Sequence, residues 1–317
     1  PYARQYTRIT AFGFPFLIAN TGMSKLILAD GSPRYSMISM LIGAIVNTIL
    51  DPIFIFGLHL GMTGAALATL FSQAVSAVLV IRALMKPEEM YQLEPKKIRL
   101  HQFLLFSILT IGLPAGFQSM MYNIANIIIQ SSLNHLGTDA MAAYTAFGKM
   151  DAFYWMISGA FSVSIATFVG QNYGAGKMNR VRKGYHASLW TVGIWGLIIT
   201  LVFVFAPNTI ATIFFHEPKA ITIAVGYLII IGFSEGFMCI ELTTIGALSG
   251  LGMTRLCSII SIIFTGSRIP LAIFLKNTSL GLHGIWWAFS STSIIKGIIF
   301  VCVFFWVTRK QTYETTM

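Results

Sequence analysis

The sequence predicts an all-α integral membrane protein that crosses the bilayer many times. Aliphatic, aromatic and cysteine residues make up 56% of the 317 residues, whereas charged residues make up only 10%. The apolar residues gather into long stretches joined by short polar links, and each stretch exceeds the roughly 20 residues that a helix needs to cross a bilayer. Backbone groups inside a membrane must hydrogen-bond within their own segment, and the stretches lack the alternation of barrel strands, so each is expected to be a helix.

Nine transmembrane helices are predicted, and they use almost the whole chain. In order, they cover residues 7–29, 36–58, 60–82, 103–134, 140–168, 187–215, 220–249, 256–276 and 283–307. Glycines stand at the turns between the first three helices and again between the last three, where the backbone turns tightly or helices approach closely: Gly31, Gly61, Gly64, Gly252, Gly281 and Gly284. A polar linker that contains Pro87 and Pro95 precedes the fourth helix.

An internal repeat organises these helices. A shift of 221 positions pairs Gly31 with Gly252, and a shift of 220 pairs the stretch Gly61–Gly64 with Gly281–Gly284. The first three helices therefore correspond to the last three, while the three helices within 103–215 have no counterpart upstream. The simplest parent has two parallel six-helix copies (6+6), of which this chain lacks the first three helices, so the chain is expected to be an N-terminally truncated fragment.

The repeat and the charges set the expected domains and orientation. Residues 1–85 form an N-terminal lobe, 86–101 a cytoplasmic linker, 102–310 a C-terminal lobe of six helices, and 311–317 a cytoplasmic tail. Most of the 21 Lys and Arg residues fall on the links of one side, and an excess of positive residues marks the cytoplasmic side. The C-terminus is therefore expected in the cytoplasm of a cell with this protein in its inner or plasma membrane.

The same composition argues against two other classes of protein. The net charge of +10 is spread over loops that topology explains, so nucleic-acid binding is not expected. The three cysteines all lie inside predicted helices, where they act as small apolar residues and not as a disulfide or metal set. No paired metal-ligand motif of an intramembrane enzyme is present in the sequence, so the chain is not expected to be an enzyme.

Five stretches carry a resemblance to a known family. They are Leu28–Arg34 (LADGSPR), Asn47–Gly57 (NTILDPIFIFG), Gly61–Thr69 (GMTGAALAT), Gly112–Pro114 (GLP) and Gly170–Lys177 (GQNYGAGK). Through them the whole chain resembles the multidrug and toxic compound extrusion (MATE) family, from the fourth to the twelfth of its twelve helices. The resemblance implies a secondary antiporter that expels organic, often cationic, compounds while admitting Na⁺ or H⁺.

An acidic residue within the second predicted helix indicates a cation-coupling site. A charge inside the membrane costs roughly 2.5–3.5 kcal/mol on insertion scales unless it is paired or solvated, so Asp51 is expected to have a function. Asn47 lies one helical turn before it, and their amide and carboxylate oxygens can bind Na⁺ together, while the carboxylate alone can carry a proton. The resemblance implies that Thr69 completes this site with an acidic residue from the helices that the chain lacks. The alternative is that Asp51 only caps backbone groups freed by Pro52.

Polar residues of the C-terminal lobe are candidates for the wall of a cavity. They are Tyr122, Asn126, Lys149, Asp151, Glu235, Glu241 and Arg268. Because buried charges are tolerated mainly when matched, Arg268 and Lys296 are expected either to pair with an acidic residue of this lobe or to contact an ion or substrate. Glu235 and Glu241 lie about 120° apart around a helix, so they are not expected to share one narrow face. Another branch of the family has acidic residues at the positions that correspond to Tyr122 and lie near Met238, so this sequence departs from the ion site of that branch.

Aromatic side chains add a second ingredient of drug binding. They crowd the fourth and fifth predicted helices at Tyr122, Tyr144, Phe147, Phe153, Tyr154 and Trp155. An aromatic face can hold a lipophilic cation by contact and by cation–π attraction, although such residues also serve ordinary helix packing.

Together these observations predict a secondary active antiporter that works by alternating access between its two lobes. It is expected to export organic drugs or toxic compounds in exchange for Na⁺ or H⁺, to act as a monomer among membrane lipids, and to need no cofactor and no metal beyond a possible Na⁺. The alternative is a flippase of lipid-linked saccharides or related lipids, which would need a large cationic cavity. Lys149, Arg268 and Lys296 keep that alternative open.

Overall fold

The structure is a computed structural model that describes residues 2–29, 31–85, 93–134 and 138–316. The described residues contain helices and no strand, which confirms the all-α prediction. The chain divides into two compact units, Pro1–Leu100 and His101–Met317.

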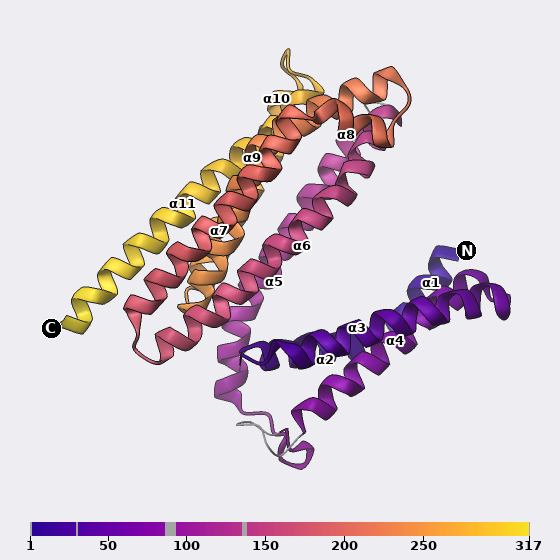
Figure 1. The fold of residues 1–317 in the computed structure, drawn as a ribbon. Helices are drawn as coiled ribbons and strands as arrows, with labels where there is room; N and C mark the ends of the chain where they lie inside the picture. The colour runs from indigo at the N-terminus through magenta and orange to yellow at the C-terminus, as the bar shows by residue number, and fades with distance from the viewer. Residues whose placement is uncertain (1, 30, 86–92, 135–137, 317) are drawn as a thin grey trace. The chain divides into compact units, whose positions relative to one another are not determined.

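The first unit is built around one helix that is rich in small residues. Its helices are α1 (Tyr2–Ala11), α2 (Phe14–Ala29), α3 (Pro33–Pro52), the π-helical turn η1 (Ile53–Gly57), α4 (Gly61–Leu84) and the 3₁₀ turn η2 (Pro95–Lys97). Helix α4 contacts α1, α2 and α3 (Figure 1). Gly43 on α3 allows close approach to α4, since a Cβ at this position would lie 2.0 Å from the Ser76 hydroxyl oxygen. That hydroxyl donates a hydrogen bond of 2.8 Å to the carbonyl of Ser39.

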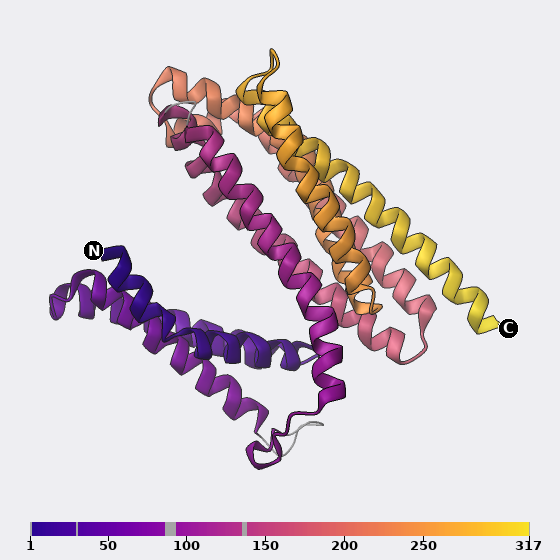
Figure 2. The ribbon, with the colours of Figure 1, turned by 180° about the vertical axis from the view of Figure 1, so that it is seen from behind.

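In the part of the chain that the structure describes, the second unit is a bundle of seven helices. They are α5 (Gln102–Asn134), α6 (Thr138–Gly174), α7 (Met178–Phe205), α8 (Pro207–Phe214), α9 (Pro218–Gly250), α10 (Thr254–Lys276) and α11 (Leu282–Thr316). Helix α9 contacts α6, α7, α8, α10 and α11, so it forms the centre of the bundle. Helix α10 lies beside α5 and α11, as Figure 2 shows from behind.

Two predicted helices are broken in the structure. The predicted helix 7–29 consists of α1 and α2, which meet at a bend of 51°, and the predicted helix 187–215 consists of α7 and α8. A proline follows each break, Pro15 at the start of α2 and Pro207 at the start of α8. Proline lacks a backbone N–H and favours the first turn of a helix, which accounts for both new helix starts.

Each of the nine predicted segments is helical, but fewer than nine helices pass a test of length and hydropathy among the described residues. Among the described residues, seven helices are long and apolar enough to cross a membrane, or eight if α1 and α2 form one span. The predicted helix 140–168 lies within α6, which is not among the seven. Helix α11 continues to Thr316, past the predicted end at residue 307 and through most of the predicted tail.

The glycines of the internal repeat adopt matching conformations. Gly31 and Gly252 have φ angles of 89° and 81°, and Gly61 and Gly281 have φ angles of 53° and 51°. A positive φ is accessible to glycine at little cost, whereas other residues rarely adopt it. These two pairs are the pairs that the repeat of the sequence predicts, so the repeat is also a repeat of backbone geometry.

Candidate functional site

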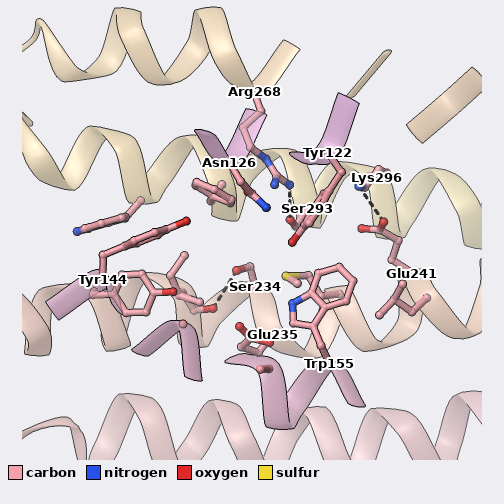
Figure 3. A pocket seen from close by; sticks show the side chains of 18 residues that line it. Tyr122, Asn126, Tyr144, Trp155, Ser234, Glu235, Glu241, Arg268, Ser293 and Lys296 are labelled. Atoms are coloured by element: carbon pink, nitrogen blue, oxygen red, sulfur yellow. Dashed lines mark hydrogen bonds and ion pairs between the residues drawn. The ribbon is translucent and has the colours of Figure 1, made fainter. Parts of the chain in front are cut away.

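A cavity of about 360 Å³ lies inside the second unit (Figure 3). Side chains from α5, α6, α9, α10 and α11 form its wall. Among the described side chains of the wall, six are aromatic, namely Tyr122, Tyr144, Trp155, Tyr227, Trp286 and Phe289, and four are charged, namely Glu235, Glu241, Arg268 and Lys296. A cavity of this size, with apolar walls and a few polar groups, is typical of sites for drug-sized molecules.

The aromatic rings form two groups on the wall. Trp286 of α11 meets Tyr227 of α9 edge to face, with ring centroids 4.8 Å apart, and its ring is nearly parallel to that of Tyr144 of α6 at 6.1 Å. Tyr122 of α5 and Trp155 of α6 form the second group, with centroids 5.6 Å apart. Because the rings come from four helices, they hold the wall together across the bundle and also offer flat apolar surfaces to a ligand.

One buried ion pair crosses from α9 to α11. The Lys296 Nζ atom lies 2.8 Å from the Glu241 Oε1 atom, and the two side chains are only 8% and 7% exposed. Lys296 also donates a hydrogen bond of 3.5 Å to the Thr265 hydroxyl of α10. The pair is one of the pairings that the sequence left open, and it neutralises two of the four charges on the cavity wall.

Arg268 of α10 is held by neutral groups of α11. Its Nε atom donates to the Thr292 hydroxyl at 3.0 Å, and one of its terminal nitrogens donates to the Ser293 hydroxyl at 3.1 Å. The guanidinium carbon also lies 4.3 Å from the centre of the Phe289 ring, which is the geometry of a cation–π contact. The side chain is therefore fixed in position at the cavity wall.

Glu235 of α9 lies at the opposite side of the cavity from Arg268 (Figure 3). It is 1% exposed, and its backbone carbonyl accepts a hydrogen bond from the Tyr154 hydroxyl of α6. Both Glu235 and Glu241 line the cavity, although they do not share one narrow helix face. The reason is that the cavity extends along the helix: six residues advance roughly 9 Å along the helix axis, so a long and broad wall accommodates both.

The other predicted cavity residues lie on α5 and α6. Tyr122 and Asn126 line the cavity from α5. Gly148 and Ala152 line it from α6, so this helix passes the cavity at the level of Lys149 and Asp151. The side chains of Lys149 and Asp151 lie outside the described residues, as do those of the aromatic candidates Phe147 and Phe153.

The predicted cation-coupling residues lie in the first unit. Asn47 and Asp51 are on α3 and Thr69 is on α4, two helices that pack against each other. The Asn47 amide nitrogen is buried and has no hydrogen-bond partner among the described residues. The Thr69 hydroxyl donates to the carbonyl of Ala65 at 2.9 Å, which leaves its oxygen lone pairs available to a cation.

Comparison with known proteins decides the family. Residues 114–274, about half of the chain, match the family described as MatE. The chain belongs to the MATE family. The resemblance carried by its sequence motifs is thereby confirmed, and this MATE chain is a multi-pass membrane protein.

Among curated proteins, the MATE chain is 26% identical over 287 residues to the multidrug export protein MepA of Staphylococcus haemolyticus, covering 90% of this chain and 63% of that protein. It is 22% identical over 316 residues to the probable multidrug resistance protein YoeA of Bacillus subtilis, covering 96% of this chain and 68% of that protein. The chain thus spans 68% of the length of YoeA and 63% of the length of MepA, which is less than two thirds.

Solved structures share the fold of the MATE chain. A MATE protein in a bent conformation superposes with a TM-score of 0.90 at 19% sequence identity, covering 99% of this chain and 70% of that chain. A MATE family multidrug resistance transporter in an outward-facing conformation gives a TM-score of 0.86 at 21% identity, with the same coverage.

Several cavity residues of the MATE chain were not among the candidates from the sequence. They are Tyr227, Ile231, Ser234 and Met238 of α9, and Trp286, Phe289 and Ser293 of α11. On α11 the residues Trp286, Phe289, Ser293 and Lys296 recur every three or four positions, so they share one helix face. This mixed aromatic and polar face is a signal in the sequence that could have identified α11 as part of the site.

Proposed function

We propose that this chain exports organic compounds from the cell in exchange for Na⁺ or H⁺, and that the compounds bind in the cavity of the second unit. The observation that carries the proposal is the cavity itself, about 360 Å³ with six aromatic side chains and buried charges on its wall. Two relatives are named as a multidrug export protein and a probable multidrug resistance protein, which supports export of varied compounds. Flat aromatic walls suit varied ligands because contact and cation–π attraction do not demand one ligand shape.

The coupling ion is proposed to bind at Asn47, Asp51 and Thr69. Three kinds of oxygen, from an amide, a carboxylate and a hydroxyl, suit a hard cation such as Na⁺, and the carboxylate also suits a proton. The amide of Asn47 can turn about its last bond, so its oxygen can take the buried position of its unpartnered nitrogen. This coupling would favour the state that releases the compound outward.

The entry of one ion provides enough free energy to export one molecule against a concentration gradient. A single charge that moves through 100 mV gives about 2.3 kcal/mol, and a tenfold concentration difference costs about 1.4 kcal/mol. Exchange of one cation for one uncharged molecule therefore sustains roughly a fifty-fold gradient. We further propose that the protein is monomeric among membrane lipids, needs no cofactor, and has its C-terminus in the cytoplasm, where positive loop residues are enriched.

Export is favoured over the flippase alternative by the charges on the cavity wall. A lipid pyrophosphate would need several free cations, but Lys296 is paired with Glu241 at 2.8 Å. The side chain of Lys149 lies outside the described residues. Arg268 is the remaining member of the three basic residues on which the flippase alternative rests.

The proposal predicts that cells that express the chain accumulate less rhodamine 123 than cells that carry an empty vector. Ionophores that collapse the Na⁺ or H⁺ gradient should remove this difference, and the ionophore that does so identifies the coupling ion. Dye fluorescence in washed cells measures the accumulation. A difference that persists after both gradients collapse would contradict ion-coupled export.

A further inference from the structure

The contacts of Arg268 set it apart from the other buried cation of the cavity. Arg268 is 4% exposed and Lys296 is 6% exposed, so both charges are withdrawn from solvent. Lys296 is paired with a carboxylate, whereas Arg268 contacts two hydroxyl groups and an aromatic ring. Among the described side chains, no carboxylate lies within ion-pair distance of Arg268, and Glu241, which acts on Arg268 from further away, is already paired with Lys296.

A buried charge that has no direct ion pair is costly, and the cost is lowest when an anion completes the site. The guanidinium has five N–H groups, of which the contacts with Thr292 and Ser293 use two. The remaining N–H groups can form two parallel hydrogen bonds with one carboxylate. Figure 3 shows Arg268 directed into the cavity, between Asn126 and Tyr122.

The guanidinium is also held ready for such a ligand. Thr292 and Ser293 are adjacent on α11, and both are less than 5% exposed. Their hydroxyls fix one edge of the guanidinium, and Phe289 covers its face. A group that is already fixed loses little conformational freedom when a ligand binds, which favours affinity.

We infer that Arg268 is an anion-binding subsite, and that the cavity selects aromatic compounds that carry a carboxylate. The carboxylate pairs with the free edge of the guanidinium, and the aromatic body lies against rings such as those of Tyr122 and Trp155, 5.6 Å apart at their centroids. The inference rests on the proposed function and adds a substrate class to it. It differs from the expectation of cationic compounds, because the recognised group is an anion.

Two related dyes test this inference in binding experiments. Rhodamine 110 carries a free carboxyl group, and rhodamine 123 has the same ring system with that carboxyl group as a methyl ester. Fluorescence polarisation with the purified chain in detergent is expected to show about tenfold tighter binding of rhodamine 110, the effect of one charged bidentate contact. Arg268→Gln should remove this preference, so that the two dyes bind with affinities within about twofold of each other.

A control variant and a competition assay complete the test. Arg255→Gln, on the same helix but outside the cavity lining, should leave both affinities unchanged. In the unaltered chain, benzoate should displace rhodamine 110 at lower concentration than benzamide, a result that does not depend on the folding of any variant. Equal affinity for the two dyes, or a preference that survives Arg268→Gln, would overturn the inference while leaving the export proposal intact. If neither dye binds, both proposals fail.

Discussion

Replacing Asp51 with asparagine is expected to abolish gradient-driven export of rhodamine 123. The substitution keeps the size and hydrogen-bonding shape of the side chain but removes the charge that binds Na⁺ or the group that carries a proton. The roughly fifty-fold gradient that one ion can sustain should therefore fall to none, since the ion no longer contributes free energy. Dye accumulation in energised cells measures the effect, and the amount of variant in the membrane should match that of the unaltered chain.

Glu94→Gln is the matched control for this experiment. Glu94 forms an exposed ion pair with Lys97, outside the predicted helices, so its neutralisation should leave export unchanged. If Asp51 only capped backbone groups near Pro52, the neutral variant would pump as well as the unaltered chain.

Replacing Lys296 with methionine is expected to lower the free energy of unfolding by about 3–5 kcal/mol, the usual cost of removing one partner of a buried ion pair. The Glu241 carboxylate would remain in a site where its side chain is only 7% exposed, without its counter-charge. Chemical unfolding of the purified chain in detergent measures the loss.

The double variant Glu241→Gln with Lys296→Met tests the cause. It removes both charges, so it should recover most of the stability that Lys296→Met loses. Lys97→Met supplies the comparison, because it breaks the Glu94–Lys97 pair, whose side chains are 46% and 75% exposed, and should cost less than about 1 kcal/mol. Equal losses for the buried and the exposed lysine would show that the Glu241–Lys296 pair does not stabilise the bundle.

The sequence predicted the long helices and their repeat well, because both depend on local properties. Hydropathy and length locate a helix. The matched glycines Gly31 and Gly252 follow from the positive φ angle that each of these turns requires, which is a property of the local backbone. The breaks before α2 and α8 were missed because the residues around them are apolar on both sides. Pro15 and Pro207 indicate these breaks in the sequence, but a prediction from hydropathy alone does not take the helix-breaking effect of proline into account.

The site was less predictable, because a cavity depends on which helix faces meet. The sequence proposed Glu241 and Lys296 as possible partners but also allowed other pairings, and only the packing of α9 against α11 selects this one. The aromatic residues of α11 were overlooked for the same reason. Trp286 is fully buried, and its place beside Tyr144 and Tyr227 follows from contacts between helices far apart in the sequence.

Protection of a cysteine in the cavity tests most directly whether exported compounds bind there. Cys302 is the exposed native cysteine, while Cys239 and Cys257 are buried, so Cys302→Ser gives a suitable background. In this background Met238→Cys places a thiol on the cavity wall, and Tyr173→Cys places one at an exposed position outside it. Saturating rhodamine 123 is predicted to slow maleimide labelling of the Met238→Cys variant at least about tenfold and to leave the Tyr173→Cys variant unaffected. An unchanged labelling rate at Met238→Cys with dye demonstrably bound would contradict the assignment of this cavity as the binding site.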